Sequence, residues 1–429
     1  MKVVKKLGKK LLCSLLERQV TALRAAHDIR VVAVVGSVGK TSTKMAIANV
    51  LGAKLRVRYQ EGNYNDRLTV PLIFFGETLP GLFAVAEWRR LLKRAKQQVA
   101  TNYPYDVVVV ELGTDAPGQI AQFAYLEPEL AVVTAVAPEH MEFFGTLDAV
   151  AAEELAIFDY AQKVLVNTDD TDARYLKDKK YDGYGLSGTP DYTVKPAVAA
   201  NPSLSGQKVS MTLAGRKLAP LTLHMLGQQG AVVSLAAAAA AEVLGLDERS
   251  IVKGLGRVVP FAGRMQILAG HKGITIIDDT YNASPTSVKA GLDVLYAAKA
   301  PQKIALLGSM NELGDYSQQA HEEVGALCDP KQLDEVVVVG KMASDWLAPV
   351  AAAKGCRVQV FDSPYAAGQH LSTQLQKGAV LFAKGSQNRV FVEEALKPLL
   401  ANKTDYHKLV RQSPEWSAVK QSQFNDFIA

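Results

Sequence analysis

Hydrophobic positions in the first half of the chain alternate between short apolar runs and longer segments with helical spacing. Residues 31–35 form a β-branched run, residues 36–40 a loop and residues 41–51 a helical segment. Two further apolar runs cover residues 107–112 and 130–136. Strands that alternate with helices predict a parallel sheet with both faces covered. In such sheets, ligands bind at the carboxyl ends of the strands.

The alternation stops and then restarts in the second half of the chain. Residues 191–223 have the pattern of short antiparallel strands, and an alanine-rich helix follows at residues 231–244. Further strands are expected near residues 274–277, 303–307, 335–339 and 379–382. The sequence therefore predicts an α/β protein with a central domain (residues 31–260), a Rossmann-like α/β domain (residues 261–403) and a polar tail (residues 404–429).

The first 30 residues predict a basic amphipathic helix. Leucines and valines recur near the helical period, and lysines stand between several of them. One interpretation is a peripheral contact with an anionic membrane or with a partner protein. The other is a helix packed on its own domain, with its lysines in solvent. The sequence leaves both open.

Composition restricts the class of protein. Of the 429 residues 48% are hydrophobic, which is enough for a large core, and the 48 Lys and Arg exceed the 43 Asp and Glu mainly through the first 24 residues. A nearly neutral remainder argues against a nucleic-acid partner. Three scattered cysteines form no zinc or disulfide pattern. No apolar run approaches a membrane span and no signal peptide is recognisable, so we expect a cytoplasmic protein.

A phosphate-binding loop is indicated between the first strand and the first internal helix. It reads Gly36, Ser37, Val38, Gly39, Lys40, Thr41 and Ser42. Backbone N–H groups at such a helix start face an anion, the lysine reaches the terminal phosphates, and the hydroxyl that follows can hold Mg²⁺. The general P-loop motif has a glycine five positions before Gly39, where this chain has Val34. An ordinary strand-to-helix turn is the competing interpretation.

Six blocks in order carry a family resemblance. They are Asn63-Tyr64-Asn65, Glu111-Leu112-Gly113, His140-Met141-Glu142, the segment 278–285 (Asp-Asp-Thr-Tyr-Asn-Ala-Ser-Pro), the segment 308–314 (Gly-Ser-Met-Asn-Glu-Leu-Gly) and Lys384-Gly385-Ser386. Together with the shortened loop, these blocks resemble the MurF branch of the Mur ligase family. The resemblance implies a P-loop central domain and a second α/β domain.

The resemblance also implies an activity. Mur ligases use ATP and Mg²⁺ to convert a carboxylate into an acyl phosphate, which an amine then attacks to give an amide. The branch implies D-alanyl-D-alanine as the dipeptide and a muramyl tripeptide as its acceptor, both small molecules. Two alternatives remain: a ligase of the family that acts on a different carboxylate without a UDP group, and a nucleotide-binding relative that has lost turnover. We expect a monomer.

Site residues follow from the resemblance by position. Residues 36–42 would hold the phosphates of ATP, with Lys40 opposing the charge on the transferred group. Thr41 and Glu111 would hold one Mg²⁺, and His140 a second metal. Arg264 would reach the γ-phosphate when the domains close about a hinge near residues 259–263. The remaining expected contacts are Asn282 near the nucleotide and Asn63, Asn65, Lys384 and Ser386 near the substrate, although any of these could be structural.

The chain departs from the family at three places. Glu154 stands where most members have a lysine that becomes carbamylated and holds the second metal, so we expect its carboxylate to replace the carbamate. Gln229 and Val233 stand at positions associated with adenine recognition, which leaves the nucleotide base open. Only 30 residues precede the first strand, where peptidoglycan members have a domain that binds UDP.

Overall fold

The computed structural model describes residues 2–60, 64–138, 140–196 and 204–424, with the backbone alone for residues 2–7. The chain forms two compact units. Unit 1 comprises Met1–Lys195, Val209–Leu221 and Val232–Val258, and unit 2 comprises Pro196–Lys208, Thr222–Ala231 and Val259–Ala429. Both units are α/β, as the sequence predicts.

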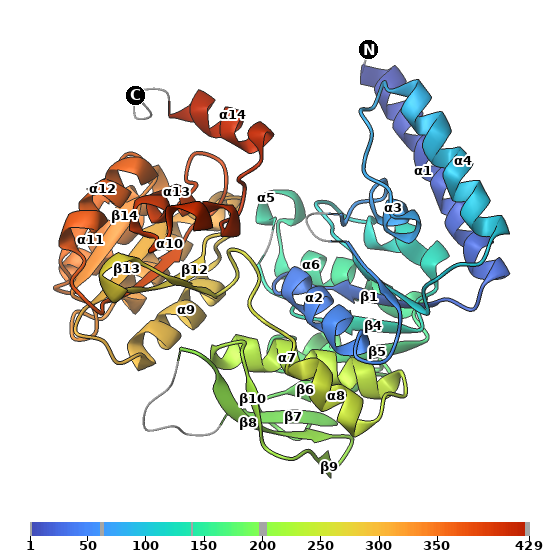
Figure 1. Ribbon diagram of the computed structural model, residues 1–429, viewed down its shortest axis with the longest axis horizontal. Helices are drawn as coiled ribbons and strands as arrows, with labels where there is room; N and C mark the ends of the chain where they lie inside the picture. The colour runs from blue at the N-terminus through green and yellow to red at the C-terminus, as the bar shows by residue number, and fades with distance from the viewer. Residues whose placement is uncertain (1, 61–63, 139, 197–203, 425–429) are drawn as a thin grey trace. The chain divides into compact units, whose positions relative to one another are not determined.

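Unit 1 is built on a ten-stranded, mostly parallel sheet (Figure 1). Its strands are β1 (Arg30–Val35), β2 (Val57–Arg58), β3 (Val107–Glu111), β4 (Leu130–Val133), β5 (Lys163–Asn167), β6 (Asp182–Gly185), β7 (Tyr192–Pro196), β8 (Gln207–Leu213), β9 (Arg216–Lys217) and β10 (Leu221–Leu223). The strand order is β10-β8-β7-β6-β5-β4-β1-β3-β2, with β9 antiparallel to β8. The last strands and the start of α7 extend into unit 2.

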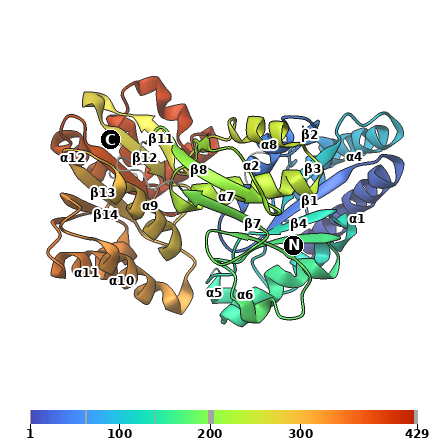
Figure 2. The same ribbon diagram turned by 90° about the horizontal axis from the view of Figure 1, so that it is seen from below.

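The helices of unit 1 are α1 (Lys2–Ala26), α2 (Lys40–Leu51), α3 (Val70–Phe75), α4 (Val85–Ala100), α5 (Met141–Phe144), α6 (Leu147–Glu154), α7 (Gly227–Val243) and α8 (Glu248–Leu255). Short 3₁₀ turns cover Ile120–Leu126, Leu155–Asp159 and Ala173–Tyr175. One face of the sheet packs against α1, α3 and α6 through a continuous apolar core. Helices α1 and α4 lie side by side in both views (Figures 1 and 2).

Strand β1 occupies the position that matters most for a ligand site. It pairs in parallel with β3 on one side and with β4 on the other. The carboxyl ends of these three strands therefore lie next to one another. The predicted strand at residues 130–136 ends earlier, at Val133. Beyond it the backbone bonds to loops: the Ala135 carbonyl accepts Ser37 N–H (2.9 Å) and Val136 N–H donates to the Asp170 carbonyl (2.8 Å).

Unit 2 has a six-stranded sheet in the order β11-β12-β16-β13-β14-β15. The strands are β11 (Gln266–Ala269), β12 (Thr275–Asp279), β13 (Lys303–Gly308), β14 (Glu335–Val339), β15 (Val358–Phe361) and β16 (Val380–Lys384). All pairs are parallel except β11 with β12. The predicted strands are present, and the sequence missed the edge strands β11 and β15 because both are short and incompletely buried.

Helices cover both faces of the second sheet. Helices α9 (Pro285–Ala297), α10 (Ser317–Leu327) and α11 (Ala348–Ala353) pack on one face. Helices α12 (Pro364–Gln374) and α13 (Glu393–Leu396) pack on the other. Shorter turns cover His271–Gly273, Gly314–Tyr316, Ala343–Leu347 and Lys397–Leu399.

The segment that the sequence sets apart as a polar tail is folded within unit 2 as far as residue 424. It contains a 3₁₀ turn (Lys403–Lys408) and helix α14 (Pro414–Gln423). Leu409, Val410, Lys420 and Phe424 are buried. In the described part of the chain, none of the helices combines the length and apolar character needed to cross a membrane.

Candidate active site

The loop after β1 is shaped by two glycines with left-handed backbone. Gly36 has φ 120° and Gly39, the residue before α2, has φ 88°. A Cβ on Gly36 would clash with the Thr134 hydroxyl and would lie 2.8 Å from the backbone nitrogen of Ala135. Only glycine fits this approach without displacing the segment after β4. The loop therefore runs against the end of β4 and opens directly into α2.

The carboxylate of Glu154 braces this loop from the end of α6. Glu154 is 1% exposed, and its Oε2 accepts a hydrogen bond from Gly36 N–H at 2.7 Å. Its Oε1 lies 4.0 Å from Lys40 Nζ, which also lies 3.5 Å from the Ser37 carbonyl oxygen. The structure thus brings Glu154 next to the phosphate-loop lysine, 114 positions away in the sequence.

A hydroxyl and a carboxylate meet beside the start of α2. Thr41 Oγ1 donates to Glu111 Oε1 at 3.2 Å. Lys44 Nζ, on the same helix and fully buried, lies 3.3 Å from Glu111 Oε2. The sequence prediction paired Thr41 with Glu111 and missed Lys44. The available signal is a cation directly before the apolar helical residues 45–48, since a lysine that is buried with them needs a charged partner.

The chemistry of this oxygen pair fits Mg²⁺. The ion prefers hard oxygen ligands and usually retains several waters, with one or two carboxylates from the protein. Thr41 Oγ1 and Glu111 Oε1 are such ligands, and Glu111 is buried. The described residues contain no cluster of three or more His, Cys, Asp and Glu side chains suited to a metal. Any ion held here would therefore depend on water and substrate oxygens for its other ligands.

His140 follows β4 in the sequence, as expected, and precedes α5. Its backbone is left-handed (φ 48°), and its Nε2 lies 3.6 Å from Asp115 Oδ1 in the segment after β3. Asp115 is largely exposed. The shared role of His140 and Glu154 at a second metal remains a prediction.

Asn65, in the segment before α3, lies beside the end of β3. Asn63 falls outside the described residues. The Asn65 carbonyl accepts the N–H of Gly113 at 2.8 Å. A Cβ on Gly113 would lie 2.5 Å from Asn65 Nδ2, so this glycine permits the asparagine side chain to approach the strand end. Asn65 is thereby held close to the segment that carries Glu111.

In unit 2, the expected residues of two separate segments form one hydrogen-bonded group. Ser386 Oγ donates to Asn282 Oδ1 at 3.0 Å, and Lys384 Nζ donates to the Asn282 carbonyl at 2.8 Å. Lys384 also forms a buried ion pair with Asp279 at 2.5 Å. Burial lowers the pKa of Lys384, and the Asp279 carboxylate opposes that shift. Arg264 stacks on Tyr281 of the same segment, with its Cζ 4.2 Å from the ring centroid.

The tail fixes these segments through buried ion pairs that the sequence prediction missed. Arg411 binds both carboxylate oxygens of Glu393 at 2.9 Å and donates to the carbonyls of Thr280 (2.6 Å) and Tyr281 (2.8 Å). Lys420 pairs with Glu393 at 3.0 Å and with Glu394 at 2.6 Å. We refer to Arg411, Lys420, Glu393 and Glu394 as the tail clamp.

The loop after β16 has an unusual backbone that the tail also supports. Asn388, Arg389 and Phe391 have positive φ values of 56°, 62° and 40°. Such conformations cost free energy and persist where surrounding contacts hold them. The Gln423 side chain accepts the N–H of Arg389 at 2.7 Å, and Phe391 packs edge-on against Trp416 and Phe424.

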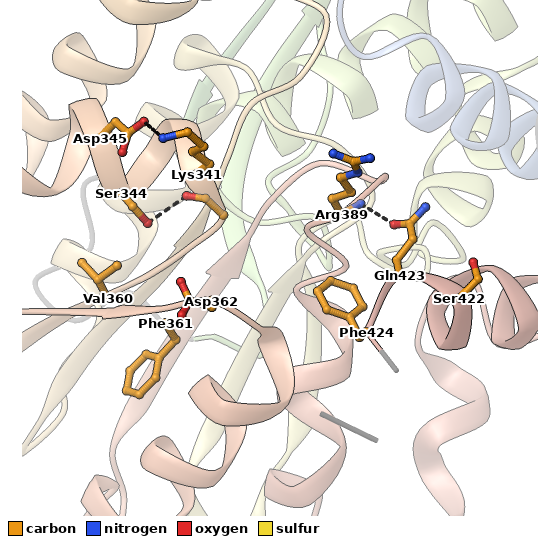
Figure 3. A pocket seen from close by; sticks show the side chains of 11 residues that line it. Lys341, Ser344, Asp345, Val360, Phe361, Asp362, Arg389, Ser422, Gln423 and Phe424 are labelled. Carbon is orange, nitrogen blue, oxygen red and sulfur yellow. Dashed lines mark hydrogen bonds and ion pairs between the residues drawn. The ribbon is translucent and has the colours of Figure 1, made fainter. Parts of the chain in front are cut away.

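A pocket of about 640 Å³ opens beside this loop within unit 2 (Figure 3). Figure 3 shows Lys341, Ser344 and Asp345 on one side, with Asp362 below them, and Arg389, Ser422 and Gln423 on the other side. The pocket lies at the carboxyl ends of β14 and β15, where Gly340 and Asp362 follow the strands. It presents both cations and carboxylates to a ligand.

Comparisons with known proteins match both units. Residues 34–241 match the profile described as Mur ligase middle domain, and residues 263–387 match Mur ligase, glutamate ligase domain. The Bacillus subtilis protein named UDP-N-acetylmuramoyl-tripeptide–D-alanyl-D-alanine ligase is 29% identical over 323 residues, covering 73% of this chain and 64% of its own. The Synechocystis protein of the same name is 29% identical over 388 residues, covering 88% and 76%.

Solved structures agree on the fold. MurF ligase from Thermotoga maritima, in complex with ADP, superposes with a TM-score of 0.74 at 23% identity, covering 93% of this chain and 84% of that one. The chain thus spans somewhat less than two thirds of the Bacillus relative, while the two profile matches together cover most of the chain. These two profile matches show that the chain belongs to the Mur ligase family, and the shortened loop and the ordered sequence blocks agree with them.

Proposed function

We propose that the chain is an ATP-dependent ligase that joins an amine to a carboxylate through an acyl phosphate. The observation that carries this proposal is the group at the end of β1, where Lys40, Thr41 and Glu111 meet around a glycine loop that opens a helix. Such a loop is suited to a polyphosphate. The ADP named with the Thermotoga relative supports ATP as the nucleotide.

The substrates we propose come from the names of the curated relatives. These indicate a UDP-linked muramyl tripeptide as the carboxylate and D-alanyl-D-alanine as the amine. The carboxylate would attack the terminal phosphorus of ATP, with ADP as the leaving group. The dipeptide amine would then attack the acyl carbon, and the tetrahedral intermediate would collapse to an amide and inorganic phosphate.

Each residue at the phosphate loop has a distinct part in this proposal. Lys40 opposes the negative charge that develops during phosphoryl transfer. Thr41 and Glu111 would hold Mg²⁺, which supplies charge neutralisation on the phosphate oxygens. Glu154 orients the loop by accepting Gly36 N–H and keeps Lys40 close by. The ammonium group of Lys44, 3.3 Å from Glu111 Oε2, offsets the negative charge of this buried carboxylate.

The pocket of unit 2 fits the amine substrate. A dipeptide is a zwitterion, so it needs a cation for its carboxylate and an acceptor for its ammonium group. Arg389 supplies a guanidinium and Asp362 a carboxylate to the same pocket, whose volume is within the range usual for small ligands. We propose that this pocket receives the dipeptide.

A phosphate-release assay tests the proposed reaction. ATP, UDP-muramyl tripeptide and D-alanyl-D-alanine are supplied together and then with each one omitted in turn, and the amide product is identified by mass. The expected result is release only with all three. ATP binding without release would favour a relative that has lost turnover, and release with another carboxylate in place of the tripeptide would favour the alternative substrate class.

Variants of the pocket separate the amine site from the phosphate site. Arg389→Met and Asp362→Asn should each raise the KM for the dipeptide about tenfold while the KM for ATP changes little. Lys331→Met, an exposed cation of unit 2 outside the pocket, is the matched control. An equal rise of both KM values would contradict the assignment of the pocket.

A further inference from the structure

Unit 1 carries a concentration of exposed apolar side chains just before α4. The exposed large hydrophobic residues in the described part of unit 1 are Leu11, Leu79, Leu82, Phe83, Val85 and Phe143. Four of these six lie between positions 79 and 85, and we call Leu79, Leu82, Phe83 and Val85 the apolar tip. Phe83 is 70% exposed and Val85 58%. Clustered exposure of this kind marks an interaction surface.

The apolar tip is held in place by the opposite side of α4. Trp88, Leu91 and Ala95 are buried at helical spacing, and Trp88 and Leu91 pack with Cys13 and Leu16 of α1. Trp88 Nε1 also donates to the Gly81 carbonyl at 3.0 Å, which ties the loop of the tip to the helix. Trp88 and Leu91 are thus buried against α1, while the side chains of the apolar tip stay exposed.

The exposed face of α4 is basic. Arg89, Arg90, Lys93 and Lys96 are exposed, and Glu87 is the one acidic residue within α4. Val85, Arg89, Lys93 and Lys96 follow one another at spacings of four, four and three, so the tip continues into a stripe of cations along one side of the helix. Lys10 of the adjacent α1 is also exposed.

We propose that the apolar tip and the basic face of α4 dock on an anionic lipid surface. Long cationic side chains reach phosphate headgroups while leucine, phenylalanine and valine side chains enter the boundary between headgroups and acyl chains. The charge complementarity carries this choice, since a second copy of the same basic helix would bring like charges together. The surface lies apart from the phosphate loop and goes beyond the proposed ligase activity.

Vesicle flotation with the full chain tests the docking. Vesicles of phosphatidylglycerol mixed with phosphatidylcholine should bind the protein, vesicles of phosphatidylcholine alone should bind it about tenfold less, and added salt should weaken the binding. Failure to bind the anionic vesicles at low salt would overturn the proposal. Phosphate release with soluble substrates is measured on the same preparations, so a failed docking and a failed ligase activity give separate results.

Two double variants assign the binding to these residues. Arg89→Glu with Lys93→Glu should reduce vesicle binding at least about tenfold, and Leu82→Ser with Phe83→Ser should reduce it while leaving soluble turnover unchanged. The matched control is Lys253→Glu with Arg257→Glu, which changes one exposed cation in α8 and one just after it. This control should bind vesicles as the unchanged protein does. An equal loss in the control, or a dimer in light scattering that only the Leu82 and Phe83 variant dissociates, would overturn the proposal.

Discussion

The phosphate loop of unit 1 and the paired segments of unit 2 are built in opposite ways. The loop owes its shape mainly to neighbours in the sequence, namely two glycines with positive φ, a lysine and the first turn of α2, with Glu154 as a distant support. The segments 279–282 and 384–391 owe theirs to residues far along the chain, chiefly Arg411 and Lys420. One region is local and the other is assembled by tertiary contacts.

The two regions should therefore respond differently to amino-acid substitution. Substitution in the local region should remove chemistry and leave the fold intact. Substitution in the clamp should disturb stability and substrate placement together, because breaking a buried ion pair leaves an uncompensated charge. Four experiments test whether the two regions respond to substitution in these different ways.

Lys40→Ala should give the largest loss of turnover. Removing the cation that opposes charge on the transferred phosphoryl group should lower kcat about a thousandfold, by analogy with the loss of one preorganised group at a developing anion. The thermal unfolding temperature should change little. Steady-state phosphate release and calorimetry check both, with Lys54→Ala, an exposed lysine just after α2, as control. A loss of less than tenfold would mean that Lys40 is not at the reacting phosphate.

Glu154→Ala should lower turnover about a hundredfold, because a misplaced loop costs orientation of the reacting groups. Glu154→Gln keeps an acceptor for Gly36 N–H and should recover part of the rate if the side chain only braces the loop. If its charge also serves a metal, both variants should require more Mg²⁺ for half-maximal rate.

Glu153 offers a matched control for this pair. Its carboxylate accepts the N–H groups of Gly118 (2.6 Å) and Ile120 (2.7 Å) and the hydroxyl of Thr114 (2.9 Å). Glu153→Ala should therefore destabilise the protein without altering the Mg²⁺ requirement. If Glu154→Ala left both rate and Mg²⁺ requirement unchanged, the replacement of a carbamylated lysine by Glu154 would be wrong.

Arg411→Ala should destabilise unit 2 by about 3–5 kcal/mol, the usual range for breaking a buried pair. Arg411→Lys should keep the charge, lose the two-oxygen contact with Glu393 and lower kcat/KM for the amine about tenfold through a higher KM. Lys331→Ala, at an exposed cation of the same unit, should cost less than about 1 kcal/mol. Equal changes in the KM values for amine and ATP would contradict a role confined to unit 2.

The phosphate loop of unit 1 could be predicted from the sequence to a greater extent than the paired segments of unit 2. Strand β1, the loop and α2 could be predicted because the apolar run, the glycines and the lysine all fall within about twenty positions. Glu154 could be placed on its helix by resemblance, but its contact with Gly36 depends on how α6 packs beside β4. Lys44 could in principle have been noticed as a cation directly before the apolar residues 45–48 of the same helix.

The tail clamp could not be predicted in the same way. Glu393 and Glu394 interrupt an apolar stretch, which indicates a buried partner, yet any of the 48 basic residues could have supplied it. Only the fold brings Arg411 and Lys420 to them. The polar composition of the tail concealed this, because its few buried residues show no helical period.

Asp278→Asn should have the smallest effect on turnover and a distinct effect on the pH dependence of stability. Asp278 is fully buried at the end of β12, and its Oδ1 accepts the Thr280 hydroxyl at 2.6 Å, while its Oδ2 has no hydrogen-bond partner among the described residues. Burial raises the pKa of Asp278 to about 6, against the hydrogen bonds from Thr280, which lower it.

Between about pH 4 and pH 6 the folded state therefore keeps a proton on Asp278 that the unfolded state releases. The free energy of unfolding should fall across this interval as pH rises, by about 3 kcal/mol from this group alone. The asparagine of the variant cannot titrate, so its unfolding free energy relative to wild type should rise from pH 4 to pH 6 and stay constant above it. Urea unfolding followed by tryptophan fluorescence measures this difference, with Asp315→Asn, an exposed carboxylate of unit 2, as control. A difference that does not vary with pH would mean that Asp278 is already ionised in the fold at pH 4, and that the segment beside the tail clamp tolerates a buried charge there.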